Sequence, residues 1–237
     1  DGGAAVSAKG LVWGTAPAPV LDTLFSLNGS GTGSFTGTMA PLDPGTTYYV
    51  RAYATNAAGT AYGQERTFLT PAILPQVVTD TIISLTDSSA LSGGTVLFDG
   101  GANVNLRGLV WSEGNNPTLD SMRSINGSGE GVFTGTMSGL EPVTTYHYRA
   151  YATNSVGTAY GEEKMFSTPA GLPTVTTDTI SMLTDSSAVS GGNVLYDGGD
   201  PVTAKGIVWS EGPQPALDSM ITTNGSGEGI FASSLAG

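Results

Sequence analysis

The stretch that decides the fold runs from Leu140 to Gly161 and reads L-E-P-V-T-T-Y-H-Y-R-A-Y-A-T-N-S-V-G-T-A-Y-G. A near copy, L-D-P-G-T-T-Y-Y-V-R-A-Y-A-T-N-A-A-G-T-A-Y-G, runs from Leu42 to Gly63. In each copy a proline turn leads into β-rich sequence in which the residues alternate with a period of two. One face of the expected strand carries Tyr146, Tyr148, Ala150 and Ala152. The pattern therefore predicts a long strand with one apolar, partly small face.

A tyrosine stands just after the turn in both copies, at Tyr48 and Tyr146. A tyrosine placed there can bury its ring and return its hydroxyl group to the backbone a few residues upstream, which is the tyrosine corner of β-sandwiches. The following Asn-x-x-Gly predicts a turn, and G-T-A-Y-G begins a further strand. We therefore predict Tyr48 and Tyr146 as structural tyrosine corners.

The whole chain repeats itself at a constant offset of 98 residues. Asp1-Gly2-Gly3 recurs at Asp99 and Asp197, and the tryptophan of each copy recurs as Trp13, Trp111 and Trp209. Two proline-bounded seams, at 70–75 and 168–173, predict short, stiff connectors. We therefore expect three units: 1–73 without its opening strands, 74–171 complete, and 172–237 without its closing strands.

The complete unit shows turn signals between short β-rich runs, and helix signals do not pair anywhere in it. About seven strands in about 100 residues is typical of an immunoglobulin-like sandwich. The expected fold class is all-β, a tandem array of antiparallel β-sandwiches. The expected strands are Val77–Leu85, Ser89–Phe98, Asn103–Ser112, a weak one at Leu119–Ser124, Gly131–Met137, Thr145–Thr153 and Thr158–Ser167.

Composition excludes several classes of function. Eight basic against 20 acidic residues leave a net charge of −12, whereas proteins that bind nucleic acid need clustered Lys and Arg. No apolar run approaches the length needed to cross a bilayer. Cysteine is absent, which excludes disulfides and thiolate chemistry and leaves the compartment open.

The pattern L-x-P-x-T-x-Y-x-x-R-A-Y-A-T-N-x-x-G resembles the closing half of a fibronectin type III domain. With the S-G-G, D-G-G, G-[LI]-V-W-[SG] and N-G-S-G landmarks, the chain is similar to the fibronectin type III-like or immunoglobulin-like tandem repeats of secreted surface proteins of Bacteroidota. The resemblance covers essentially the whole chain. It implies an extracellular stalk, adhesin shaft or filament, or a spacer within a larger enzyme. The tryptophan departs from the fibronectin type III pattern, because Trp111 falls on the third expected strand and not on the second.

No residue pattern indicates catalysis or a cofactor. The only histidine is His147, and the other copy has Tyr49 at that position, so no repeated general base could activate a hydroxyl group. Asp197, Asp200, Glu211 and Glu228 are oxygen ligands of the kind calcium prefers. Asp200 is alanine in the other copies, however, and acidic Gly-rich turns form without metal. We therefore expect no enzyme activity, no cofactor and no metal site.

Trp13, Trp111 and Trp209 could stack against sugar rings as a row, or lie in the core. In the alternation around Trp111, Val104, Leu106, Gly108 and Val110 share one face, and Asn105, Arg107, Leu109 and Trp111 share the other. If the first set forms the core, a bulge at Gly108 is needed to turn the indole inward. We expect a core tryptophan, and ligand stacking stays as the alternative.

An Asp-[Ser/Thr]-apolar motif occurs at two repeat positions. It places hydroxyl groups at Thr23, Ser121 and Ser219, and again at Thr81 and Thr179. The motif is similar to the O-glycosylation acceptor of Bacteroidota secreted proteins, so these five residues are candidates for modification. Asp-Ser and Asp-Thr also initiate turns without any modification. The N-G-S sequences at Asn28, Asn126 and Asn224 indicate hairpin turns.

Taken together, the sequence predicts a non-catalytic structural array outside the cell. Its expected partners are neighbouring repeats and, in a filament, identical chains, with a glycan or a host surface ligand as a further partner. It predicts no nucleic-acid binding and no membrane insertion in this segment. The alternatives are a carbohydrate- or protein-binding module, and spacer repeats within a secreted hydrolase.

Overall fold

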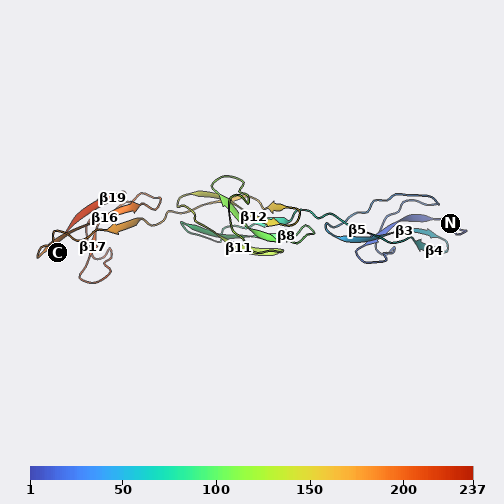
Figure 1. Cartoon of the computed structure of the whole chain (residues 1–237), viewed down its shortest axis with the longest axis horizontal. Coiled ribbons are helices and arrows are strands. Elements are labelled where there is room, and N and C mark those ends of the chain that lie inside the picture. Colours follow the sequence, from blue (N-terminus) through green and yellow to red (C-terminus); the bar gives the residue numbers. More distant parts are fainter. Residues whose placement is uncertain (237) are drawn as a thin grey trace.

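The computed structural model describes residues 1–236 as three lobes in line, with the chain ends at opposite ends of a rod (Figure 1). β1 to β5 lie in the first lobe, β6 to β14 in the second and β15 to β19 in the third. No helix occurs within 1–236. The all-β fold class is therefore confirmed. The chain passes from the first lobe to the second between Leu69 and Gln76, and from the second to the third between Ser167 and Thr174.

The complete unit contains two antiparallel sheets. In the first, β8 lies between β11 and β6, and the short β7 also pairs with β8. Its strands are β6 (Gln76–Thr79), β7 (Ser84–Leu85), β8 (Ser89–Phe98) and β11 (Gly131–Ser138). In the second, the order is β10-β9-β12-β13, and β14 also pairs with β12. Its strands are β9 (Leu106–Ser112), β10 (Met122–Arg123), β12 (Thr145–Thr153), β13 (Thr158–Tyr160) and β14 (Lys164–Ser167).

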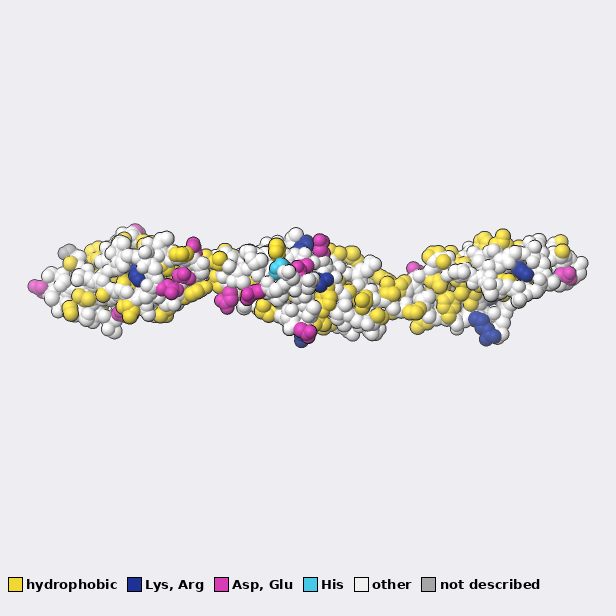
Figure 2. Space-filling model, turned by 90° about the horizontal axis from the view of Figure 1, so that it is seen from above, with side chains coloured by type: hydrophobic (Ala, Val, Ile, Leu, Met, Phe, Trp, Pro, Cys, Tyr) yellow, Lys and Arg dark blue, Asp and Glu magenta, His cyan; other side chains and the backbone are white. Residues whose placement is uncertain are grey.

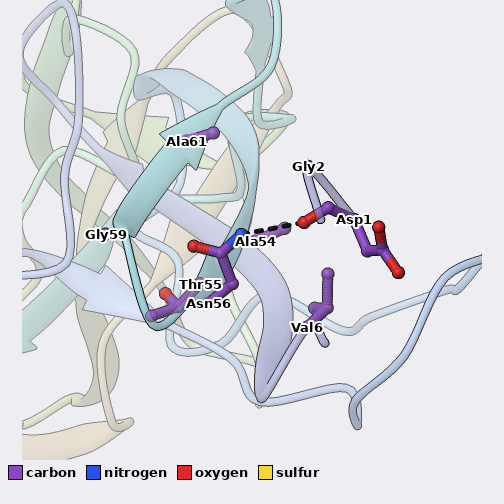
Figure 3. Close-up of a pocket in the computed structure, with 8 residues that line it drawn as sticks. All are labelled: Asp1, Gly2, Val6, Ala54, Thr55, Asn56, Gly59 and Ala61. Atoms are coloured by element: carbon purple, nitrogen blue, oxygen red, sulfur yellow. Dashed lines mark hydrogen bonds between the residues drawn. The ribbon is translucent and has the colours of Figure 1, made fainter. Parts of the chain in front are cut away.

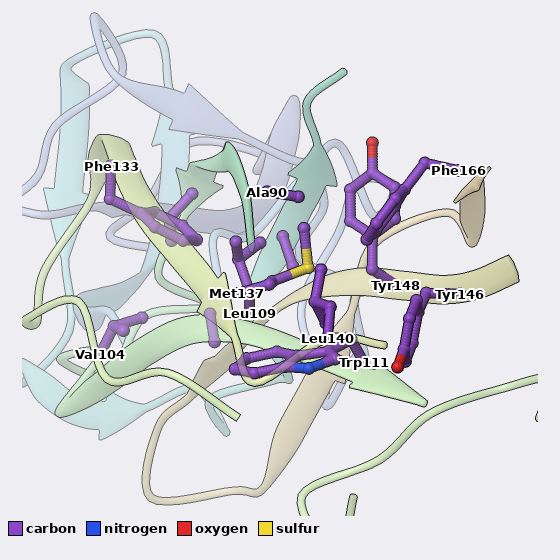
Figure 4. Packing of buried hydrophobic residues seen from close by; sticks show 13 residues of the cluster. Ala90, Val104, Leu109, Trp111, Phe133, Met137, Leu140, Tyr146, Tyr148 and Phe166 are labelled. Atoms are coloured by element: carbon purple, nitrogen blue, oxygen red, sulfur yellow. The ribbon is translucent and has the colours of Figure 1, made fainter. Parts of the chain in front are cut away.

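The core lies between these two sheets (Figure 4). All four residues of the predicted apolar face of β12 are buried in it, with exposures of 1% or less. Apolar residues from β8, β9, β11 and β14 complete the cluster, namely Ala90, Val96, Leu109, Trp111, Phe133, Met137 and Phe166. The period-two pattern therefore identified the buried face of the central strand correctly.

The opposite face of β12 is also covered, which the alternation did not predict. Tyr151 and Val110 point away from the core, yet both are 0% exposed. The segment that follows β9, through β10 to Ser124, folds back over this face. The Tyr151 hydroxyl donates to the Ser124 carbonyl at 2.9 Å, and the Leu119 amide donates to the Tyr160 hydroxyl at 3.1 Å. This arrangement forms a second, smaller core outside the sandwich.

Most expected strands are present, but their lengths differ. Ser89–Phe98 and Thr145–Thr153 are confirmed residue by residue. The expected strand Asn103–Ser112 begins only at Leu106, and Leu119–Ser124 shortens to the two residues of β10. Thr158–Ser167 is broken after Tyr160, where the Gly161 amide returns to the Ala150 carbonyl at 2.8 Å.

The expected strand Val77–Leu85 is interrupted after Thr79. The kink turns the carbonyls of Asp80 and Thr81 towards Ser92, whose hydroxyl lies 3.1 Å from each. The Tyr148 hydroxyl donates to the same Asp80 carbonyl at 3.0 Å. Burial raises the pKa of Tyr148, and the nearby Asp80 carboxylate adds to that rise while the hydrogen bond with Ser92 lowers it.

The outer lobes each present part of this arrangement. The first has one five-stranded sheet equivalent to the second sheet of the complete unit, and no strand of this described lobe is a counterpart of β6 or β8. Its strands are β1 (Ala8–Gly14), β2 (Leu24–Phe25), β3 (Thr47–Asn56), β4 (Gly59–Tyr62) and β5 (Arg66–Leu69). The third lobe has β15 (Thr174–Thr177), β16 (Ser187–Tyr196) and β19 (Gly229–Ala236) in one sheet, and β17 (Val208–Trp209) with β18 (Met220–Ile221) in another.

Candidate functional site: the junctions between repeats

Each junction begins at the turn before the long strand. The Tyr146 hydroxyl accepts the Glu141 amide at 3.0 Å, and the Tyr48 hydroxyl accepts the Asp43 amide at the same distance. These are the hydrogen bonds of a tyrosine corner. Tyr146 is 1% exposed, and its ring stacks on Phe166 with the centroids 5.7 Å apart. A buried ring thus fixes the position of an exposed turn at the end of the unit.

The residue that leads into each connector is fixed to the same turn. The Thr168 hydroxyl donates to the Glu141 carbonyl at 2.6 Å and accepts the Thr144 amide at 2.9 Å. In the first unit, Thr70 makes the corresponding bonds to Asp43 and Thr46 at 2.6 and 2.9 Å. The chain therefore leaves each unit in a defined direction.

The first connector is bonded to both units that it joins. The Ile73 amide donates to the Gly100 carbonyl at 2.9 Å, and the Gly45 amide donates to the Pro71 carbonyl at 3.3 Å. Gly100 has a φ of +80°, and a Cβ atom there would lie 2.1 Å from the Ile73 carbonyl oxygen. Only glycine fits this approach of connector and turn.

The second connector repeats the first with every partner shifted by 98 residues. The Gly171 amide donates to the Gly198 carbonyl at 2.8 Å, and the Val143 amide donates to the Pro169 carbonyl at 3.4 Å. Gly198 has a φ of +83°, and its Cβ atom would lie 2.3 Å from the Gly171 carbonyl oxygen. Apolar side chains gather at the two narrow waists of the rod (Figure 2). The two junctions are therefore built in the same way, one repeat apart.

An asparagine side chain completes the first junction. The Asn154 amide nitrogen donates to the Ile73 carbonyl at 2.7 Å and to the Asp99 carbonyl at 2.8 Å. Its oxygen accepts the Val156 amide at 2.8 Å, which fixes the direction of the side chain. The Asn-x-x-Gly pattern predicted only a turn at this asparagine. The signal of a further role was its recurrence as Asn56, 98 residues earlier (Figure 3).

The three tryptophans do not form an exposed row. Trp111 and Trp13 are 5% and 2% exposed, and Trp209 is half-buried. No bulge at Gly108 is needed to turn Trp111 inward, because β9 pairs with β12 from Leu106 to Ser112 without a shift in register. Trp111 points inward because Leu109 and Trp111 lie on the core face, as Figure 4 shows. Stacking on a sugar needs an exposed indole face, which neither Trp13 nor Trp111 offers.

The five candidate glycosylation residues fall into two structural groups. At the first position the hydroxyl group takes part in a local turn: Thr23 donates to the Val20 carbonyl at 2.7 Å, and Ser121 accepts the Thr118 amide at 3.2 Å. Ser219 is placed like Ser121. At the second position, Thr81 and Thr179 are exposed beside the kink of the first strand. Thr23 is exposed as well, whereas Ser121 and Ser219 are half-buried.

The N-G-S asparagines contact the segment that follows them. Asn28 donates its side-chain amide to the Thr36 carbonyl at 2.9 Å, although Thr36 lies in no strand. Asn224 donates to the Ala232 carbonyl on β19 at 2.7 Å, and a Cβ atom on Gly135 of β11 would lie 2.6 Å from the Asn126 side-chain oxygen. In the second and third lobes these side chains thus cover part of an edge strand that carries no charge of its own.

Two of the four acidic residues considered for calcium accept hydrogen bonds from backbone amides. Glu228 accepts the Asp197 amide at 3.0 Å, and the Asp197 side chain accepts the Gly199 amide at 2.8 Å. Within residues 1–236, no group of three or more His, Cys, Asp or Glu side chains is placed to hold a metal. His147 lies 3.1 Å from Glu163 through Nδ1. This pair has no counterpart in the first unit, where the equivalent residue is Tyr49.

The comparisons with known proteins add little to these observations. No family model matches the sequence, and no curated protein matches it. Among solved structures, the crystal structure of chicken CNTN1 FN1-FN3 domains is similar over 100% of this chain and 80% of that chain, with 15% identity and a TM-score of 0.43. The fold described above is all-β, and its complete unit has two antiparallel sheets. In the described part of the chain, no helix is long and apolar enough to cross a membrane.

Proposed function

We propose that this chain is a section of a stiff, non-catalytic spacer array on the outside of a cell, such as a stalk, an adhesin shaft or a filament. The observation that carries the proposal is the equivalence of the two junctions. Ile73 to Gly100 and Gly171 to Gly198 are the same hydrogen bond one repeat apart. Equivalent joints between repeated units give a regular rod.

The rod is expected to be stiff because bending it at a junction would break several hydrogen bonds. The first connector is held by backbone bonds to both of its units and by the Asn154 side chain. Each such bond contributes about 1 kcal/mol, so bending would lose several of them together. Proline residues at both ends of the connector limit its conformations further. A flexible linker would instead leave its backbone groups to water.

The experiment is small-angle X-ray scattering on the chain and on a variant with Gly100→Ala and Gly198→Ala. The unmodified chain should scatter as a straight rod. The double variant should bend and show a shorter maximum dimension, because each added Cβ atom would collide with a connector carbonyl oxygen. Gly114→Ala with Gly212→Ala is the matched control, since neither position has a neighbour within 4 Å. A bent unmodified chain would contradict the proposal.

O-glycosylation belongs to the same proposal. A glycan on Thr81 or Thr179 would project from the lobe and keep neighbouring rods apart, together with the charge of −12. Peptide mass measurement on protein from the native host would test Thr81, Thr179, Thr23, Ser121 and Ser219. Higher occupancy on Thr81, Thr179 and Thr23 than on Ser121 and Ser219 would agree with their exposure. Unmodified peptides at all five positions would remove this part of the proposal.

A further inference from the structure

Strand β11 forms a long free edge of the first sheet of the complete unit. It stands at one end of the strand order β11-β8-β6 and pairs with β8 over its whole length, Gly131–Ser138, without a shift in register. It contains neither a charged residue nor a proline. Strand β19 has the same place in the third lobe, where it pairs with β16 in the same regular way and is equally uncharged. Such an edge can pair with a further strand, and proteins usually interrupt or charge it.

The other edges of the complete unit are short, charged or irregular. β7 and β10 have two residues each, and β13 has three. β14 has four residues and includes Lys164. β6 also has four, and its register with β8 shifts between Gln76 and Val77. Among the described strands of this unit, β11 is therefore the one with a long, regular and uncharged edge.

The backbone groups of β11 that point away from the sheet belong to its even-numbered residues. The Ile83 amide donates to the Leu91 carbonyl at 2.8 Å, on the side of β8 that faces β7. Backbone groups alternate in direction along a strand, so those of the neighbouring Ala90 face β11 and its partner there, Met137. The residues of β11 between the bonded ones point their amides and carbonyls outward, namely Val132, Thr134, Thr136 and Ser138.

One part of this outward edge is occupied by a side chain. In the third lobe, Asn224 donates to the carbonyl of Ala232 on β19 at 2.7 Å. Asn126 is the equivalent residue of the complete unit and lies against the centre of β11. Thr136 and Ser138 are exposed, and within residues 1–236 no hydrogen bond occupies their outward backbone groups. The free part of the edge thus runs from Thr136 to Ser138.

We propose that this free part of β11, and its equivalent on β19, is where a second copy of the chain adds its own edge strand in antiparallel orientation. Thr136 of one copy then lies opposite Ser138 of the other, and each such pair exchanges two backbone hydrogen bonds. The inference rests on the proposed array, because it joins two rods side by side. The hydrogen bonds of the two pairs correspond to a dissociation constant on the order of 1 mM for one edge.

A second copy fits this edge in charge, in symmetry and in spacing. The net charge of −12 repels two copies, so they can meet closely only where charge is absent, as it is on β11 and β19. Antiparallel pairing about a two-fold axis keeps Glu130, just before β11, far from Glu130 of the other copy, whereas parallel pairing would place them together. The two edges recur 98 residues apart, and a second copy carries them at the same interval. Thr81 follows β6, at the opposite edge of the sheet, so a glycan there would not cover β11.

The test is NMR of the ¹⁵N-labelled chain between about 0.05 and 2 mM, a range that brackets the expected dissociation constant. The amide signals of Thr136 and Ser138, and of Ser234 and Ala236 on β19, should move as the concentration rises. Thr136→Pro with Ser234→Pro removes the outward amide donors but no bond to β8 or β16, so the shifts of Ser138 and Ala236 should disappear. Unchanged signals of the core residue Trp111 would show that this variant is folded.

Two matched variants separate edge pairing from other contacts between copies. Thr136→Val with Ser234→Val keeps the backbone donors and should leave the concentration-dependent shifts in place. Asn126→Ala with Asn224→Ala frees a further carbonyl on each edge, so the association should tighten about fivefold for each added hydrogen bond.

The proposal is overturned by the absence of any shift in the parent chain, by shifts that persist in the proline variant, or by their loss in the valine variant. If the proline variant does not fold, the asparagine variant decides, and an unchanged affinity there overturns the proposal. A straight rod in scattering that shows no association overturns this inference alone. A bent chain that associates through β11 overturns only the rod.

Discussion

The first lobe and the complete unit share almost the same sequence, yet they differ in which residues are buried. Ala150 is 0% exposed in the complete unit, whereas the equivalent Ala52 is exposed in the first lobe. Trp13 and Trp111 nevertheless stay buried in both. The difference indicates that burial of Ala150 requires the β6, β8, β11 sheet, which the described first lobe lacks. Burial of the tryptophan does not require that sheet, because Trp13 is buried without it.

Strand β11 makes the same point about local sequence. Residues 131–138 read G-V-F-T-G-T-M-S and pair along their whole length with β8. The equivalent residues 33–40 read G-S-F-T-G-T-M-A but form no strand. The described first lobe holds no counterpart of β8, so this segment has no partner strand. Strand propensity therefore produces a strand only where a partner offers its hydrogen bonds.

The largest expected effect comes from truncating the aromatic side chain that only one lobe buries. Phe133 is 6% exposed and belongs to the core, whereas Phe35 is half-buried. Phe133→Ala should lower the unfolding free energy of the complete unit by about 3 to 5 kcal/mol. Phe35→Ala should cost the first lobe no more than about half as much. Hydrogen exchange read by mass spectrometry reports each lobe separately, and equal losses would abolish the comparison.

Replacing the glycine on the covered outer face should lower the unfolding free energy of both lobes by a similar amount. A Cβ atom on Gly108 would lie 2.1 Å from the Ser124 carbonyl oxygen, and one on Gly10 would lie 1.9 Å from the Ser26 carbonyl oxygen. Gly108→Ala and Gly10→Ala should each cost about 1 to 3 kcal/mol, because backbone must shift. Denaturant unfolding of both variants measures this. A large loss at one position and none at the other would show that the outer core differs between the lobes.

The contact between the first strand and the long strand exists only in the complete unit. Thr79 is 1% exposed, and its hydroxyl accepts the Ala150 amide at 3.0 Å. Thr79→Val keeps the shape but leaves that amide without a partner, at a cost of about 1 to 2 kcal/mol. Thermal unfolding should show the loss in the complete unit alone. An unchanged midpoint of thermal unfolding would mean that this hydrogen bond does not contribute to the stability of the complete unit.

The smallest expected effect is a dependence of the stability of the complete unit on pH in the alkaline range. Burial raises the pKa of Tyr148 above its ordinary value of 10.0, so the folded unit keeps its proton where the unfolded chain loses it. This contribution to stability is complete below about pH 10 and is lost as the pH rises through the folded pKa. The first lobe has Val50 at this position. Stability measured from pH 8 to 12 should therefore decline less steeply in Tyr148→Phe than in the parent chain.

The sequence was sufficient for the fold class and for the main buried face. The alternation around Tyr146 and Tyr148 identified the core side of β12, and the constant offset indicated an array. The sequence did not show that Trp111 points inward on a regular strand, because alternation alone does not say which of the two faces is buried. The burial of Tyr151 was also out of reach, since it depends on a distant segment folding back.

The junction was only partly predictable. The prolines indicated stiff connectors, and the repeated Asp-Gly-Gly motif indicated turns. The connector and the Asp-Gly-Gly turn meet through backbone hydrogen bonds, such as that from Ile73 to Gly100. These bonds join amide and carbonyl groups, which almost every residue carries. Side-chain patterns contain no information about such bonds, except where a glycine is required by a positive φ and a close approach.

The central claim, that identical joints make a regular rod, is tested most directly by pairs of spin labels. Leu24, Met122 and Met220 are equivalent residues one repeat apart on β2, β10 and β18, with exposures of 44%, 41% and 42%. The sequence has no cysteine, so cysteines placed there carry the only labels. Double electron–electron resonance should give narrow distance distributions with the same mean for the pairs 24–122 and 122–220. Broad distributions, or two different means, would contradict the account.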